Sequence, residues 1–288
     1  MANQKEIENL VAKIVSEIVN KTEAEEKCEC KCCCDEQIPD ITAVRHQDDF
    51  HVPDAVNEPE YMRMKARTPA RIGVWRAGTR LKTDTFLRFR ADHAVAVDAV
   101  FTEVPEDVIK EMDMPEFRTK CHSKAEYLQR PDLGRLFDEE TAAKIKAECK
   151  QKPTVQIIVS DGLSSSAVEA NIDAVLPAIY NGLKATNLKV GTPFFVKYGR
   201  VGAEDSVASV LGAKVTVILL GERPGLATSS SLSAYIVYGG YPGIPEANRT
   251  VVSNIHKAGT PPVEAGAYIA ELCKQIFDKK ASGLDLKA

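Results

Sequence analysis

The chain has 288 residues, of which 44% are hydrophobic and 27% charged, and its mean hydropathy is −0.19. This composition is typical of a globular protein with a sizeable core, and it excludes fibrous and wholly disordered proteins. The longest apolar stretch, Val215 to Leu220, is far too short to span a membrane. With 37 basic and 41 acidic residues the net charge is −4, which disfavours nucleic acid as a partner.

The N-terminal residues 1–20 predict an amphipathic helix. Its apolar stripe has three- and four-residue spacing and consists of Ile7, Leu10, Val11, Ile14, Val15, Ile18 and Val19. Such a short helix needs a partner for its stripe. Two alternatives remain open: a tethered docking peptide, which the long polar linker that follows favours, or a first helix folded onto its own domain. The few basic residues disfavour a helix bound to a membrane surface.

Residues 21–60 predict a flexible linker that contains most of the cysteines. Five of the eight cysteines fall in one short run, namely Cys28, Cys30, Cys32, Cys33 and Cys34. Structural metal sites use paired cysteines on either side of a folded spacer, and this run has no second half. We therefore expect adventitious metal or redox chemistry rather than a built metal site, and a site shared between chains stays open. Because no signal peptide precedes the run, we expect a reducing compartment and no disulfide framework.

Residues 61–150 predict a mainly helical subdomain. Helix-start patterns occur at Thr83–His93, at Pro105, and at Pro131–Arg135, which leads into a helix over residues 138–150.

Residues 151–288 predict alternating strands and helices. Strands are expected at residues 154–159, 194–196, 213–220 and 233–238, with helices at 165–183, 204–211 and 263–280. This alternation indicates an α/β domain with a mostly parallel, twisted sheet covered by helices on both faces, a Rossmann-like arrangement. Ligands of such sheets bind beyond the carboxyl ends of the strands.

Four loops near those ends are rich in glycine and hydroxyl groups. They are Ser160–Ser164, Gly191–Pro193 with the segment Lys197–Val201 after the next strand, Gly221–Leu226, and the segment from Ser253 to Gly259. Glycine lets a bulky ligand approach the backbone, so these loops are candidates for ligand binding.

No catalytic motif accompanies these loops. The sequence has neither GxxxxGK[ST] nor GxGxxG, which disfavours a nucleotide hydrolase and a dinucleotide oxidoreductase. The serines after Gly162 lack the final glycine of a GxSxG elbow, and we expect them to cap a helix. We therefore predict no catalytic residue in this chain.

Two side chains in the loops have competing interpretations. His256 lies one residue away from a DxHxxG cobalt-ligand pattern, but Asn254 replaces the orienting carboxylate, so we expect ordinary hydrogen bonds. Glu222 follows an apolar strand directly. It either pairs with Arg223 or a neighbouring loop, or accepts hydrogen bonds from the amide or hydroxyl groups of a ligand.

Several strings, in this order, make the chain similar to the small (light) chain of ethanolamine ammonia-lyase over about residues 71–283. They are Leu87–Phe89 with Ala91–His93, Arg130–Arg135, Ser160–Ser164, Gly191–Val196 with Tyr198–Val201, Gly221–Leu226, Ser231–Ser233, and Ser253–His256 with Gly259–Ala265. The resemblance implies an adenosylcobalamin-dependent enzyme that converts ethanolamine to acetaldehyde and ammonia. A separate large chain would perform the rearrangement, and this chain would clamp the cobalamin from the other side.

The same resemblance implies that Val201, Glu222 and Val251 bind the cofactor. Val201 would contribute a backbone group and Glu222 a side-chain acceptor. At position 251 relatives can have cysteine, and the valine here favours a backbone or packing contact. The family's cobalamin keeps its own benzimidazole as lower ligand, which agrees with the interpretation of His256.

The resemblance also suggests a cellular location for the protein and leaves alternative functions open. Family members have N-terminal segments that resemble peptides addressing enzymes into a bacterial microcompartment, so residues 1–20 would contact a shell or cargo protein within the cytoplasm, or serve assembly. A corrinoid-binding or assembly protein without a part in turnover is the alternative. A complete enzyme would need a catalytic set that the sequence lacks.

Overall fold

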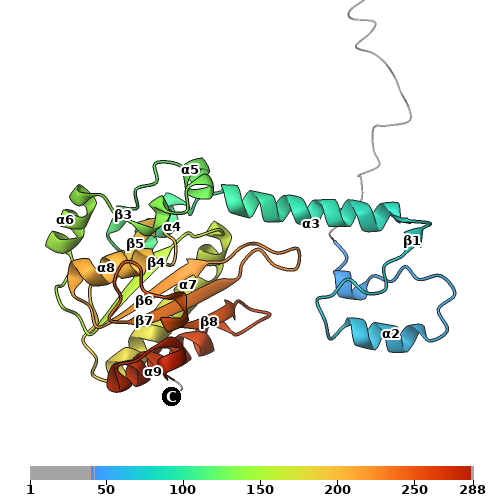
Figure 1. Cartoon of the computed structure of the whole chain (residues 1–288). Helices are drawn as coiled ribbons and strands as arrows, with labels where there is room; N and C mark the ends of the chain where they lie inside the picture. Colours follow the sequence, from blue (N-terminus) through green and yellow to red (C-terminus); the bar gives the residue numbers. More distant parts are fainter. Residues whose placement is uncertain (1–39, 42, 287–288) are drawn as a thin grey trace, which may run out of the picture. The chain divides into compact units, whose positions relative to one another are not determined.

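The computed structural model describes residues 40–41 and 43–286 (Figure 1). The predicted helix within residues 1–20 and the cysteine run from Cys28 to Cys34 lie outside these residues. All the elements below belong to one compact unit that begins at Val44.

A mixed sheet forms the centre of this unit (Figure 1). Its strands, in spatial order, are β3 (Glu116–Arg118), β5 (Phe194–Lys197), β4 (Val155–Ser160), β6 (Val215–Gly221), β7 (Leu232–Tyr238) and β8 (Arg249–Ile255). The first four are parallel, β7 is antiparallel to β6, and β8 is antiparallel to β7. Every residue of β4 and β6 is buried, as expected of parallel strands covered on both faces.

Helices cover both faces of the sheet. The long helices α7 (Ser165–Ala185) and α9 (Pro262–Lys279) pack against one another and against the face that includes Val217 of β6. The other face, which includes Ile218, packs against α8 (Ala203–Leu211) and α6 (Glu139–Glu148). The alternation of side chains along each strand thus divides the core into two layers. The predicted α/β class and mostly parallel, helix-covered sheet are confirmed.

The residues before β4 are mainly helical and add small strands. In chain order they form η1 (His46–Asp48), α2 (Glu58–Lys65), β1 (Arg76–Ala77), β2 (Arg80–Leu81), α3 (Thr83–Phe101), α4 (Glu106–Glu111), β3, α5 (Lys124–Gln129), η2 (Leu133–Arg135) and α6. Two further 3₁₀ turns lie near the end of the chain. The turn η3 (Glu246–Asn248) directly precedes β8, and η4 (Gly283–Leu286) follows α9. Because β3 pairs with β5, this segment supplies the edge of the same sheet. The predicted boundary at residue 150 stays a prediction.

The expectation of a loop from Ser253 onward is wrong for its first part. Ser253 to Ile255 belong to β8, and only His256 to Gly259 lie beyond the strand. The register between β7 and β8 shifts next to Leu232, and Asn254 has a left-handed φ of 60°. Such a bulge breaks the two-residue alternation by which a strand is recognised, and here it leaves two consecutive polar residues exposed.

Candidate functional site

The carboxyl ends of five strands meet at one edge of the sheet. Strands β3, β5, β4 and β6 are parallel, and β8 has their direction because β7 between β6 and β8 is antiparallel to both. The loops after β4, β5 and β6 therefore lie beside one another, which is where α/β sheets bind ligands.

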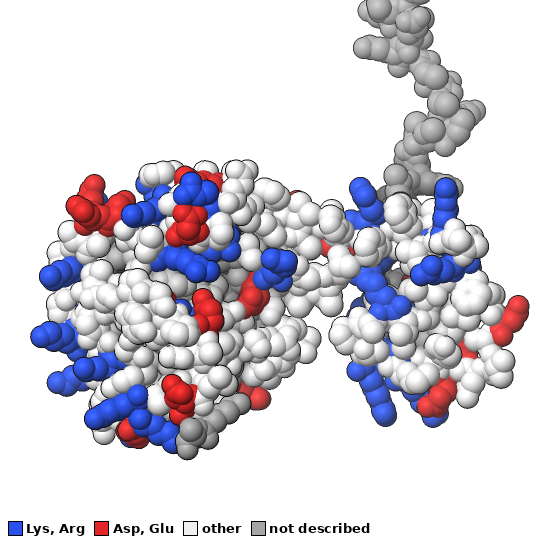
Figure 2. Space-filling view, in the orientation of Figure 1, with Lys and Arg blue, Asp and Glu red and all other residues white. Residues whose placement is uncertain are grey.

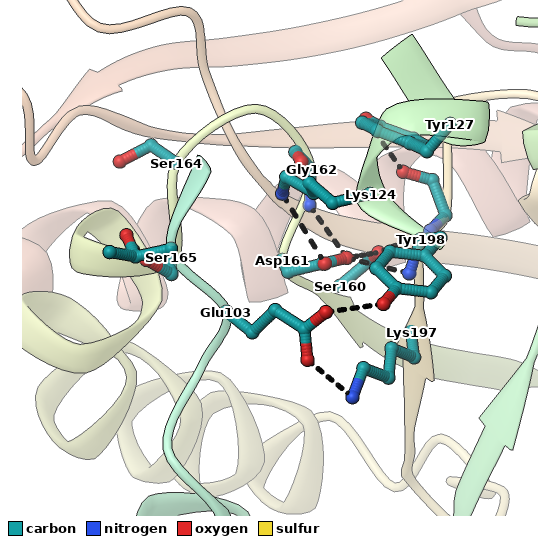
Figure 3. Close-up of polar contacts among 12 residues, drawn as sticks. Glu103, Lys124, Tyr127, Ser160, Asp161, Gly162, Ser164, Ser165, Lys197 and Tyr198 are labelled. Carbon is teal, nitrogen blue, oxygen red and sulfur yellow. Dashed lines mark hydrogen bonds and ion pairs between the residues drawn. The ribbon is translucent and has the colours of Figure 1, made fainter. Parts of the chain in front are cut away.

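Asp161, directly after β4, joins these loops through a buried carboxylate (Figure 3). Its Oδ1 accepts hydrogen bonds from the backbone N–H of Tyr198 at 2.8 Å and of Gly162 at 3.0 Å. Lys124 Nζ lies 3.6 Å from Oδ2 and donates to the Gly162 carbonyl at 3.0 Å. Burial raises the pKa of Asp161, and Lys124 is the main charge that opposes this shift. The ends of β4 and β5 and the helix α5 are thereby held together.

The loops after β4 and β6 touch backbone to backbone. Leu163 N donates to the Gly221 carbonyl at 2.9 Å, and Gly162 has a left-handed φ of 56°. A Cβ on Gly162 would lie 2.3 Å from that same carbonyl oxygen. Glycine is therefore required here because any side chain would separate the two loops.

The segment after β5 is fixed by aromatic and ionic contacts. The Arg200 guanidinium lies 4.4 Å from the centroid of the Tyr127 ring and donates to the Tyr127 carbonyl at 2.8 Å. On the other side, Tyr198 donates its hydroxyl to Glu103, and Lys197 pairs with the same carboxylate at 2.6 Å (Figure 3). These contacts orient the backbone immediately before Val201.

A pocket of about 320 Å³ opens at this edge, and Val201 and Glu222 both line it. The other lining residues are Tyr127, Arg135, Leu163, Arg200, Gly202, Leu220, Gly221, Tyr235 and Glu246. Tyr235 donates its hydroxyl to Glu222 Oε1 at 2.6 Å. Burial, together with the Glu222 carboxylate, raises the pKa of Tyr235, so the phenol stays protonated and remains a donor. The carboxylate of Glu222 is thus held at the pocket by a fixed hydrogen bond.

Val251 lies on the strand next to this pocket rather than in its lining. It pairs with Tyr235 across β7 and β8, and paired residues of antiparallel strands share one face of the sheet. Its side chain is 46% exposed. The structure therefore brings Val201 and Glu222 together and places Val251 beside the tyrosine that contacts Glu222.

The residues of the pocket that the sequence did not single out include Tyr127, Arg200, Tyr235 and Glu246. Arg200 stands in the string that predicts the loop, but its stacking on α5 depends on a segment far away in the chain. The position of Tyr235 could have been predicted from the alternation of its strand. Its neighbours Ala234 and Ile236 are buried on one face of the sheet, so Tyr235 lies on the other face, toward Glu222.

Three side chains of these loops have hydrogen-bond partners within the chain. Ser164 Oγ accepts from Ala167 N at 3.2 Å and caps α7, which confirms the predicted helix cap. His256 Nδ1 accepts from Ala258 N at 3.2 Å, and Nε2 lies 2.8 Å from Asn254 Oδ1, which confirms the expected hydrogen bonds. Glu222 has no ion pair with Arg223 among the described residues, since its partner is Tyr235.

The described residues contain neither a metal-ligand group nor a membrane-spanning helix. Residues 40–41 and 43–286 contain no group of three or more His, Cys, Asp or Glu side chains arranged for a metal ion. Within the same residues, every helix is too short or too polar to cross a lipid bilayer. On the α/β part of the face in Figure 2, basic and acidic side chains are interspersed rather than gathered by sign.

Comparisons with known proteins agree with the resemblance seen in the sequence. The family model described as ethanolamine ammonia-lyase light chain matches residues 58–287. The ethanolamine ammonia-lyase small subunit of Fusobacterium nucleatum is 50% identical over 294 residues, which cover all of both chains. The protein of the same name from Clostridium tetani is 57% identical over 250 residues, covering 87% of this chain and 85% of the relative. The chain therefore belongs to the ethanolamine ammonia-lyase light chain family.

Proposed function

We propose that this chain is the small subunit of an adenosylcobalamin-dependent ethanolamine ammonia-lyase, in which it clamps the cofactor against a large subunit. The complex would convert ethanolamine to acetaldehyde and ammonia. The observation that carries this proposal is that Val201 and Glu222 line one pocket at the carboxyl edge of the sheet. When bound, adenosylcobalamin supplies the radical chemistry through its cobalt–carbon bond, so the chain itself needs only to bind and orient.

The hydrogen-bonding groups of the pocket fit a corrinoid, whose edge carries primary amides and whose tail carries a phosphodiester. Within the described residues, the backbone N–H groups of Val201 and Gly202 have no hydrogen-bond acceptor, so they are donors for an amide carbonyl or a phosphate. Glu222 is an acceptor for an amide N–H, because Tyr235 occupies only its Oε1. Valine at 251 adds an apolar contact on the same face of the sheet.

The size of the pocket supports a clamp rather than an enclosing site. Pockets that bury a whole ligand of drug size have volumes of roughly 300–1,000 Å³. A corrinoid is much larger than such a ligand, and a pocket of about 320 Å³ holds only part of its edge. The remainder of the cofactor would need a second protein surface, which is the role proposed for the large subunit.

An exposed apolar stripe on α3 is our candidate for contact with that subunit. The residues Phe86, Phe89, Val97 and Phe101 are exposed and, with His93, follow helical spacing on one side of α3. Val97 and Phe101 line a groove of about 430 Å³ together with Pro224 to Leu226. That loop begins at Glu222, so one loop contributes residues both to the groove and to the proposed cofactor pocket. Contiguous exposed apolar surface of this kind is typical of protein interfaces.

We also propose that residues 1–20 address the enzyme to a microcompartment in the bacterial cytoplasm. The support is the apolar stripe from Ile7 to Val19, which suits a groove on a shell or cargo protein. A variant that lacks residues 1–20 should assemble with the large subunit and turn over ethanolamine, but should no longer sediment with shells. Continued sedimentation with shells would assign these residues to assembly or to another role.

The main test is reconstitution with a large chain. The two chains are coexpressed and purified through a tag on this one, then supplied with adenosylcobalamin and ethanolamine, and acetaldehyde is followed with a coupled reductase. We expect turnover that requires both chains and the cofactor. Copurification and cobalamin binding without turnover would favour the assembly protein, and absence of copurification would contradict the proposal.

The assignment of Glu222 is tested by Glu222→Ala in the assembled complex. Loss of a charged acceptor that becomes buried in the complex should weaken cobalamin binding by about 1–3 kcal/mol. Spectroscopic titration with cyanocobalamin measures this loss independently of turnover. The control is Glu264→Ala, since Glu264 is exposed on α9, which packs on the opposite face of the sheet. Equal affinities of the wild type and Glu222→Ala would remove Glu222 from the site.

The docking surface is tested by two identical substitutions on α3. Val97→Asp puts a carboxylate into the stripe and should weaken association with the large subunit at least about tenfold, because an apolar contact leaves the charge unpaired. Val95→Asp is the matched control, since Val95 is also exposed but points away from the stripe. Binding is measured by titrating one subunit with the other. Similar effects of both variants, or no effect of either, would place the interface elsewhere.

A further inference from the structure

Arg249, the first residue of β8, is buried among three carboxylates. Its NH1 lies 2.6 Å from Glu204 Oε1 and 2.8 Å from Asp205 Oδ1, and its NH2 lies 2.7 Å from Asp205 Oδ2. Its Nε donates to Glu246 Oε2 at 2.7 Å. The side chains of Arg249, Glu204 and Asp205 are buried, whereas Glu246 is 66% exposed. Four of the five N–H donors of the guanidinium are thus engaged with acids.

The cluster connects the two segments that carry Val201 and Val251. Glu204 and Asp205 lie in the first turn of α8, and Glu204 N donates to the Val201 carbonyl at 3.1 Å. Val251 lies two residues after Arg249 in the same strand. One side chain therefore fixes the turn that contains Val201 relative to the strand that contains Val251.

Glu246 extends the same network to the pocket itself. It lies in η3, immediately before β8, and it lines the pocket together with Val201 and Glu222. Arg249 therefore contacts one wall of the pocket directly, at Glu246, and it holds the turn with Val201 and the adjacent strand with Val251 through their backbones.

Burying the charged groups of this cluster costs free energy when the chain folds. Glu204 Oε2 is buried without a hydrogen-bond partner, and burial raises the pKa of Glu204 although the Arg249 guanidinium opposes this shift. The other ionisable groups of the cluster are Arg249, Asp205 and Glu246. A well-packed hydrophobic cluster of similar volume is often as stable as a buried ionic one, so stability does not explain the arrangement. Fixed geometry is what a guanidinium with three directional partners provides.

We propose that Arg249 is a positioning residue for the cofactor pocket. It acts through Glu204 and Asp205 on Val201, through its own strand on Val251, and through Glu246 on the pocket wall. This inference rests on the proposed function, because it concerns the affinity of the same pocket for cobalamin.

The test is Arg249→Lys in the complete complex with the large subunit. Lysine keeps the charge but cannot hold three carboxylates in the geometry of a guanidinium. We expect cyanocobalamin affinity to fall at least about tenfold, as is usual when an orienting contact is lost, while the subunits still copurify. The Michaelis constant for adenosylcobalamin should rise by a similar factor, with a smaller change in kcat.

Two further variants separate positioning from general destabilisation. Ile269→Val shortens a core side chain of α9 on the opposite face of the sheet and should leave cobalamin affinity unchanged despite a lower melting temperature. If Arg249→Lys fails to assemble, Asp205→Asn removes one charge at nearly constant volume, and we expect the same loss of affinity.

The outcomes distinguish a failure of the proposed function from a failure of the role proposed for Arg249. If the wild-type complex does not bind cyanocobalamin, the proposed function fails. If the wild type binds and Glu222→Ala weakens binding, but neither Arg249→Lys nor Asp205→Asn does, only the role of Arg249 is wrong. An equal loss of affinity in Ile269→Val would also overturn it, because the effect would then be one of stability.

Discussion

The carboxylate of Asp161 connects the loops that make the candidate site. It accepts from the backbone of Gly162 in its own loop and of Tyr198 in the next, and it faces Lys124 on α5. These groups come from three separate stretches of the chain, so the site exists only once the sheet has formed. Removing one partner of a buried ion pair typically costs about 3–5 kcal/mol, because the remaining charge is left uncompensated. The geometry of the pocket is therefore tied to the stability of the fold.

Arg249 forms a second junction of the same kind on the other side of the pocket. Asp161 holds the ends of β4 and β5 together, and Arg249 holds α8 to the start of β8. Between them lie Val201, Glu222 and Tyr235, whose backbone donors and side-chain acceptor are fixed before a ligand arrives. A binding surface that is ordered in advance loses less entropy on association, which favours tight binding of a large cofactor. Two buried ionic clusters then fix the geometry of this surface, a role that a hydrophobic cluster of similar volume would not serve.

Much of the fold was predictable because its signals are local. The apolar runs at β4 and β6 indicate buried parallel strands, and the serine before α7 and the prolines before α9 mark helix starts. The strand β3 has only three residues and one buried side chain, so its pairing with β5 left no local signal. The helix α5, which carries Lys124, is only six residues long and was missed for the same reason.

The candidate site was likewise predictable only where its signals are local. Glu222 follows a wholly buried strand, so its position at the rim follows from the sequence. The hydrogen bond from Tyr235 to Glu222 depends on the register between β6 and β7, and the stacking of Arg200 on Tyr127 depends on a contact across 73 residues. The bulge at Asn254 hid the end of β8 because it interrupts the alternation of the strand. Contacts between distant segments, rather than residue types, thus limited the prediction.

The carboxyl groups around the pocket are engaged with other groups of the chain. An enzyme that performs its own acid–base chemistry places titratable groups where water is excluded, so that their pKa values shift toward the working pH. Here burial raises the pKa of two acids, Asp161 and Glu204, and both are occupied with structural partners. At the pocket, Tyr235 holds the carboxylate of Glu222 by a hydrogen bond, and the loop that begins at Glu222 also lines the apolar groove on α3. Fixed acceptors and donors beside an exposed apolar surface are what the proposed clamping role requires.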